Sequence, residues 1–177
     1  MLKIKYFIGK YLLNRDINRL IKCDKFLSYN DIKSVCVIIP VDEKISPNTF
    51  KEIVKFFPKE VKVDVFGVQN VKELSSDFVA SEFRILSFDD FNFFQTPKAS
   101  LYSDLKKSSY DVLINYVNND SLHSHFVAAN IKAHTKISNR DIKNIFMYNI
   151  TLTVKVNTEI HFIKQVIFYL KNISCKE

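Results

Sequence analysis

One stretch near the middle of the chain, residues 109–133 (SYDVLINYVNNDSLHSHFVAANIKA), constrains the fold most strongly. A nearly continuous apolar run from 112 to 117 gives way through Asn118, Asn119 and Asp120 to apolar residues at helical spacing. An apolar run of this length is typical of a strand that is buried on both faces of a parallel sheet. The stretch therefore predicts a central strand that leads into a helix, with Asn118 or Asp120 as the helix cap.

The rest of the chain repeats this alternation of short apolar runs and helical patterns. Strands are expected at residues 35–39, 61–66, 83–86, 112–117, 135–138 and 150–156. The first helix after a strand is expected behind Ser46, a suitable N-cap, with Pro47 at the first helical position. The full order is strand, helix, strand, strand, helix, strand, helix, strand, strand, helix.

This order predicts an α/β fold, a three-layer sandwich with a mostly parallel sheet, because parallel neighbours need crossover connections that place helices on the faces. With 177 residues the chain has the usual length of one domain. It contains no internal repeat and no low-complexity linker. We therefore expect a single α/β domain over residues 32–174, preceded by a helical arm over residues 1–25.

The N-terminal arm carries most of the net charge. Residues 1–25 hold seven Lys or Arg and two Asp, which gives +5 of the formal total of +7. An amphipathic helix is expected from residue 2 to about residue 23, with one apolar stripe that includes Tyr6, Leu13 and Ile17. The charge and the helix together point to a basic amphipathic arm.

A second apolar side lies roughly opposite this stripe, at Ile4, Phe7, Ile8 and Tyr11, with cations interspersed. One side can then pack on the body while the other meets a partner or lipid headgroups. In the alternative, both sides are covered within the chain and the lysines form a solvated rim. The residues expected to contact a partner or surface are Lys3, Ile4, Lys5, Phe7, Ile8, Lys10, Tyr11, Arg15, Arg19 and Lys22.

Several classes of site are excluded by what the sequence lacks. The only glycines are Gly9 and Gly67, so no glycine-rich phosphate loop can be written and a nucleotide held by such a loop is excluded. Cys23, Cys36 and Cys175 are far apart, which indicates neither a disulfide framework nor a zinc site, and we expect no cofactor. No run of residues suits a membrane span or a signal peptide, so we expect a cytoplasmic protein, with peripheral attachment to the inner membrane as an option.

A ligand pocket is expected, where one exists, at the carboxyl ends of the parallel strands. The candidate ligand-binding residues there are Asn118, Asn119, Asp120, Ser121, His123 and His125. The alternative is that these side chains cap the helix and face solvent. Residues two apart on a helix point in different directions, so the two histidines are not expected to share a metal.

The same central stretch, extended to YDVLINYVNNDSLHSHFVAANIKAHTKIS, carries a likeness that continues from YFIGKYLLNRDINRLIK through FDDFNFF to FIKQVIFYLKNI. These segments resemble a family of small Bacteroidetes proteins that is known only as a domain of unknown function. Asp111 and His125 match the family pattern, whereas Asn115 stands where the family usually has Asp, His123 where it often has Pro, and Ser138 where it has Gly. The resemblance implies a fold and no particular reaction.

A more distant likeness is to the N-terminal half of heptosyltransferase-like glycosyltransferases, which also have an apolar strand, a polar turn, an Ala/Leu-rich helix and a basic strand. This likeness implies a Rossmann-like sheet. It also implies, by analogy, a remnant that binds a small ligand or a nucleotide sugar around residues 118–125.

The two likenesses and the charge pattern leave two functional expectations. The first is a non-enzymatic interaction module that docks through its basic helix to a protein complex, an anionic membrane surface or RNA. The second is the ligand-binding remnant at the strand ends. A third use of the arm, in a homodimer, also stays open.

Overall fold

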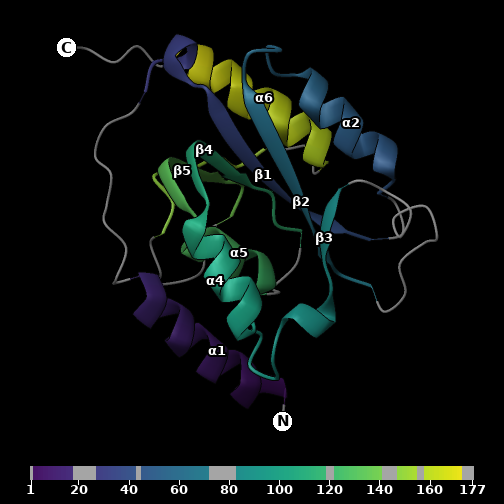
Figure 1. The fold of residues 1–177 in the computed structure, drawn as a ribbon, viewed down its shortest axis with the longest axis vertical. Coiled ribbons are helices and arrows are strands. Elements are labelled where there is room, and N and C mark those ends of the chain that lie inside the picture. Colours follow the sequence, from purple (N-terminus) through teal and green to yellow (C-terminus); the bar gives the residue numbers. More distant parts are fainter. Residues whose placement is uncertain are drawn as a thin grey trace.

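One parallel sheet of six strands organises the fold, in the order β3-β2-β1-β4-β5-β6 (Figure 1). The computed structural model describes residues 2–17, 27–42, 45–71, 83–118, 122–140, 147–154 and 158–172. The strands are β1 (Ser34–Val41), β2 (Lys62–Gln69), β3 (Arg84–Leu86), β4 (Ser109–Asn115), β5 (Lys132–Ser138) and β6 (Ile150–Thr151). The chain winds outward from β1 in one direction and then from β4 in the other, which is the doubly wound order of Rossmann-like sheets.

Helices cover both faces of this sheet, so the predicted three-layer sandwich is confirmed. The helices are α1 (Leu2–Ile17), α2 (Pro47–Lys55), α4 (Ala99–Lys107), α5 (His123–Asn130) and α6 (Glu159–Asn172), with short 3₁₀ turns at η1 (Tyr29–Asp31) and η2 (Phe88–Asp90). In Figure 1, α2 and α6 lie over one face, α4 and α5 lie over the other, and α1 packs outside α5.

The apolar strands bury side chains on both faces, as expected of a sheet covered on both sides. In β1, Cys36 and Ile38 belong to the core beneath α4 and α5, whereas Val35 and Val37 belong to the core beneath α2 and α6. All four side chains have no exposed surface. This double burial explains why these runs lack a regular polar alternation.

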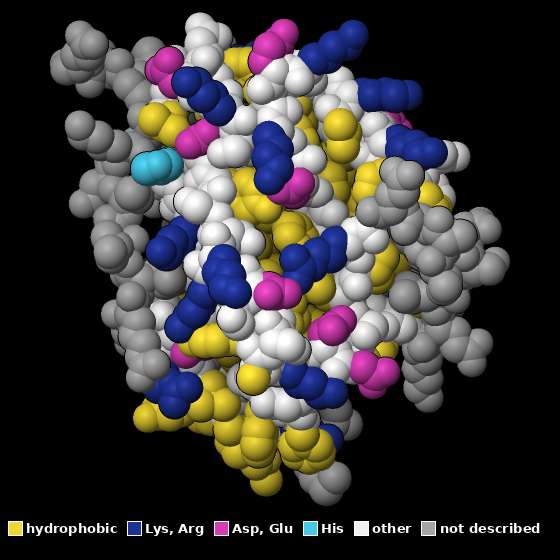
Figure 2. All heavy atoms as spheres, viewed as in Figure 1, with side chains coloured by type: hydrophobic (Ala, Val, Ile, Leu, Met, Phe, Trp, Pro, Cys, Tyr) yellow, Lys and Arg dark blue, Asp and Glu magenta, His cyan; other side chains and the backbone are white. Residues whose placement is uncertain are grey.

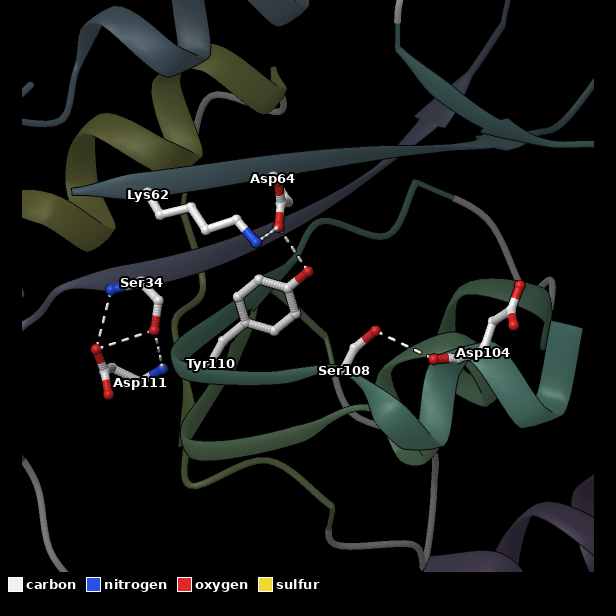
Figure 3. A network of polar contacts seen from close by, with 7 residues as sticks. All are labelled: Ser34, Lys62, Asp64, Asp104, Ser108, Tyr110 and Asp111. Atoms are coloured by element: carbon white, nitrogen blue, oxygen red, sulfur yellow. Dashed lines mark hydrogen bonds and ion pairs between the residues drawn. The ribbon is translucent and has the colours of Figure 1, made fainter.

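Side-chain hydrogen bonds join the amino ends of the strands (Figure 3). The Asp111 carboxylate on β4 accepts bonds from the backbone N–H groups of Lys33 (2.8 Å) and Ser34 (2.9 Å) and from the Ser34 hydroxyl (3.0 Å). Partial burial raises the pKa of Asp111, but these bonds outweigh it and the pKa is lowered overall. Tyr110 donates to Asp64 of β2 at 2.8 Å, so this edge of the sheet is pinned by structural contacts.

The structure differs from the sequence expectations at β5, β6 and α5. Strand β5 begins at Lys132, earlier than expected, and β6 covers Ile150–Thr151, which pair with Ile137 and Ser138 of β5. Residues 152–154 of the expected last strand are not in a strand, and residues 155–156 lie outside the described residues. Helix α5 begins at His123 and buries all eight of its residues, because α1 and α4 contact it in addition to the sheet. The proposed cap at Asn118 is therefore wrong, and Asp120 lies outside the described residues.

Candidate functional site

Helix α1 is docked on the body of the protein along its inner side. Leu13 is fully buried in the core beneath α5, and Tyr6 and Ile17 pack against the same core. Gly9 is also buried, and a Cβ at this position would lie 2.6 Å from the Phe94 carbonyl oxygen. The backbone of α1 thus approaches another segment so closely that a side chain would not fit without a shift.

The outer side of α1 stays uncovered. Its apolar side chains are exposed by 65% at Ile4, 77% at Phe7, 39% at Ile8 and 70% at Tyr11. We call these four side chains the outer face of α1. Figure 2 shows hydrophobic side chains gathered at the lower end of the molecule, where α1 lies. The expectation that both sides of the helix are covered within the chain is therefore wrong for these residues.

Basic side chains accompany the outer face. Lys5 places its Nζ 3.3 Å from the centre of the Phe93 ring, and Arg15 is about half-exposed and lies 3.8 Å from the Asp16 carboxylate. Lys10 is half-buried on α1. Residues 1–15 contain no Asp or Glu, so the charge on this part of the helix has one sign. The side chain of Lys3, and Arg19 and Lys22 altogether, lie outside the described part of the chain.

A tight turn at residues 92–96 stands beside α1. Its base is the antiparallel bridge between Phe91 and Pro97, and its tip carries Phe93, whose side chain is 57% exposed. The sequence does not indicate which phenylalanine of the FDDFNFF segment faces outward. Phe91 is buried in the core and Phe93 is not, and the sequence spacing of four phenylalanines gave no signal that distinguishes them.

The carboxyl edge of the sheet is the second candidate site. Asn118 is exposed and donates to Asp42, after β1, at 3.2 Å, and it accepts a bond from Asn70, after β2, at 3.4 Å. The hollow beside these groups leaves about 10 Å³ for the centre of a water molecule, which is room for about one water. Asn119, Asp120 and Ser121 lie outside the described residues. Asn118, Asp42 and Asn70 thus use their side-chain polar groups on one another.

The two candidate histidines are separated in the structure and are used in packing. The centres of the His123 and Phe91 rings are 4.2 Å apart. Burial lowers the pKa of His123 to about 4. His125 shares a 2.8 Å hydrogen bond between its Nδ1 and the Tyr148 hydroxyl, and burial together with the charge of Arg140 lowers its pKa to about 4. No group of three possible metal ligands occurs in the described ranges.

A buried polar cluster beneath the sheet was not predicted. The side-chain nitrogen of Asn115 donates to the Tyr148 hydroxyl at 2.6 Å, and its side-chain oxygen Oδ1 has no hydrogen-bond partner within the described structure. Lys136 donates to the carbonyl of Ala128 at 2.6 Å, near the end of α5, and burial lowers its pKa to about 8. These contacts join residues that are distant in sequence, so no local pattern could have indicated them.

Comparison with known proteins identifies a family for this chain. The family of unknown function DUF6913 matches residues 5–173, which includes α1 from Lys5 onward. No curated protein and no solved structure matches the chain. None of the helices in the described residues combines the length and apolarity that a bilayer crossing requires.

Proposed function

The chain belongs to this family of unknown function, and we propose that it is a non-enzymatic module that attaches peripherally to an anionic membrane through the outer face of α1. The observation that carries the proposal is the exposure of Ile4, Phe7, Ile8 and Tyr11 on a helix whose other side is already buried in the protein. Attachment at the cytoplasmic side of the inner membrane fits the sequence expectation and is part of the proposal.

The apolar side chains favour a lipid surface because they need an apolar environment and stay exposed among the described residues. An amphipathic helix that lies in the interface buries its apolar face among the headgroups and upper acyl chains. Here the protein body takes the place of solvent on the opposite side, since Gly9 and Leu13 are buried against it. The helix is therefore already folded before it meets a membrane, and binding carries no cost for forming it.

The basic side chains favour an anionic surface over a neutral one. Lys5, Lys10 and Arg15 lie on the same helix as the outer face, and no carboxylate occurs before Asp16. Each cation near an anionic bilayer contributes up to about 1 kcal/mol; Arg15, which lies 3.8 Å from the Asp16 carboxylate, and the half-buried Lys10 contribute less than an exposed, unpaired cation would. This attraction weakens as salt is added.

Other partners fit the outer face less well. RNA binding uses cations and stacked aromatic rings, but it gives no role to the exposed aliphatic side chains of Ile4 and Ile8. A protein complex and a second copy of the chain both remain outcomes of the test below. The nucleotide-sugar alternative gains no support from the carboxyl edge, where about 10 Å³ is open beside groups that bond one another.

Vesicle flotation with Phe7→Ser tests the proposal against a matched control, Phe168→Ser. Phe168 is 60% exposed, close to the 77% of Phe7, but it lies on α6 over the opposite face of the sheet. With vesicles of phosphatidylcholine and phosphatidylglycerol, we expect Phe7→Ser to bind about tenfold more weakly, because it loses part of the burial of one aromatic side chain. Phe168→Ser should bind as wild type does.

Equal weakening by the two substitutions would contradict the proposal, since binding would not depend on the outer face of α1. A second outcome would assign the outer face to another partner. In it, wild type does not bind vesicles but binds RNA, a protein or a second copy of the chain in solution, and Phe7→Ser weakens that binding. Both substituted side chains are largely exposed, so thermal unfolding of the two variants should match wild type.

A further inference from the structure

We propose that the turn at residues 92–96 is a second membrane contact, whose exposed Phe93 inserts into the same anionic bilayer as the outer face of α1. This inference rests on the proposed function and extends it from one helix to two separate segments of the chain. It names a lipid-binding residue outside the basic helix, and it fixes how the body is oriented on the membrane.

The turn is built as a rigid support for its tip. The backbone N–H of Asn92 donates to the Thr96 carbonyl at 2.9 Å, and the Asn92 side-chain oxygen accepts from the N–H groups of Phe94 (2.9 Å) and Thr96 (3.2 Å). Gln95 adopts a positive φ of 65°, which closes the turn tightly. Phe93 is thus held at the tip by bonds that leave its own side chain outside.

The base of the turn is tied to the rest of the body. The Gln95 side-chain oxygen accepts a bond from the N–H of Leu122, just before α5, at 3.0 Å. Phe91, at the start of the turn, is buried in the core and stacks on His123. An exposed aromatic side chain on a support of this kind loses little conformational freedom when it inserts.

The turn lies directly against α1. Lys5 lies over the Phe93 ring at 3.3 Å, and the backbone at Gly9 lies against Phe94, as the 2.6 Å approach of a Cβ to the Phe94 oxygen shows. Figure 1 shows the segment between η2 and α4 reaching the N-terminal end of α1. Phe93 therefore adds a second exposed aromatic side chain beside the helix that carries the outer face, and Lys5 lies next to it.

A lipid surface explains this arrangement better than a further intramolecular contact. The Phe93 ring is more than half exposed although Phe91 and Pro97 beside it are buried, so the turn orients Phe93 outward and Phe91 inward, with Phe94 half-buried. A cation next to an exposed aromatic ring suits the headgroup region, where the ring inserts and the ammonium meets lipid phosphate.

The absence of tryptophan from the chain permits a direct test with single-tryptophan variants. Phe93→Trp, Phe7→Trp and Phe168→Trp each introduce the sole indole, at exposed positions where the fold should tolerate it. Emission is recorded with phosphatidylcholine vesicles, with mixed phosphatidylcholine and phosphatidylglycerol vesicles, and with the mixed vesicles containing brominated lipid as a quencher. We expect Phe93→Trp and Phe7→Trp to shift to the blue and to be quenched with the mixed vesicles, whereas Phe168→Trp does neither.

The possible outcomes separate this inference from the proposed function. A response of Phe7→Trp without one from Phe93→Trp overturns the second contact and leaves attachment through α1 standing. No response from either variant overturns both. Equal responses from all three variants indicate adsorption without a fixed orientation, which also overturns the second contact. A Phe93→Ser variant, expected to bind mixed vesicles about fivefold more weakly than wild type, provides a readout that does not depend on the indole.

Discussion

The carboxyl edge of the sheet and the outer face of α1 differ in whether their side chains already have partners within the protein. At the edge, Asn118 bonds to both Asp42 and Asn70, and about 10 Å³ of open space lies beside them. On α1, Phe7 and Tyr11 are exposed by 77% and 70%. The polar side chains at the carboxyl edge bond to one another, whereas the apolar side chains on the outer face of α1 are exposed and can contact a partner.

This difference shows why a general rule about fold does not locate a site by itself. Doubly wound sheets bind ligands outside the carboxyl ends of their strands, and the sequence pointed to residues 118–125 for that reason. Polar side chains can, however, satisfy one another across neighbouring strand ends, as Asn118 does. Exposed aromatic and aliphatic side chains can only be satisfied by something that covers them, so the uncovered helix is the stronger indication of a partner.

The comparison requires that α1 be packed firmly on the rest of the protein. Leu13→Ala tests this packing, and of the substitutions considered it should change the free energy of unfolding most. Leu13 is fully buried beside α5, so its truncation should lower the free energy of unfolding by about 3 kcal/mol, from lost burial and a residual cavity. Ile4→Ala, on the outer face of the same helix, should change it by less than about 0.5 kcal/mol. Urea unfolding measures both values.

If Leu13→Ala were as mild as Ile4→Ala, α1 would be a loosely attached arm, and its exposed face would no longer be a fixed surface. The decisive quantity is therefore the difference between the two changes in the free energy of unfolding, one for Leu13→Ala and one for Ile4→Ala.

Acid should weaken the junction between the two regions, where α5 begins. His123 and His125 have folded-state pKa values of about 4, against 6.5 in an unperturbed histidine. The unfolded chain therefore binds protons first as the pH falls. The contribution of the two neutral histidines to the free energy of unfolding is fully present above pH 6.5. It decreases as the pH falls towards about 4, by up to about 1.4 kcal/mol per pH unit for each histidine.

The measurement is the free energy of unfolding across this pH range for wild type and for His123→Phe, which keeps a ring against Phe91 without a titrating group. The variant should show a shallower loss of stability. An identical pH dependence in the two proteins would show that His123 is protonated as readily in the folded chain as in the unfolded one.

The smallest effect is expected at the carboxyl edge. Asn118 is exposed, so Asn118→Ala should cost no more than about 0.5 kcal/mol. Because the hollow among the described residues of the edge holds only about 10 Å³, we expect that nucleotide sugars do not raise the melting temperature of wild type in a thermal-shift assay. A rise that Asn118→Ala removes would reverse the comparison and would make the edge the functional site.

The sequence predicted the order of strands and helices and the parallel sheet, because buried strands and amphipathic helices leave periodic patterns along the chain. It also separated the two sides of α1, since Leu13 and Ile4 fall on opposite sides of a helical wheel. It was wrong about the last strand at residues 152–154, because the alternating pattern does not show that β6 pairs with β5 only at Ile137 and Ser138 within the described residues.

The remaining features depend on contacts between distant residues. The approach of Gly9 to Phe94, the bond between Gln95 and Leu122 and the packing of His123 on Phe91 all join segments that no local pattern relates. The second part of the proposed membrane surface is made by these contacts, so it could be recognised only once the chain was folded.

Flotation of the wild-type protein with vesicles tests the central claim most directly. Pure phosphatidylcholine vesicles and mixed phosphatidylcholine and phosphatidylglycerol vesicles are compared at low and high salt, with no substitution in the chain. We predict that the protein floats with the mixed vesicles at low salt and that high salt partly releases it from them. With the neutral vesicles, the protein should remain in the bottom fraction and not float. Failure to float with the mixed vesicles, or equal flotation with both kinds, would contradict attachment to an anionic membrane.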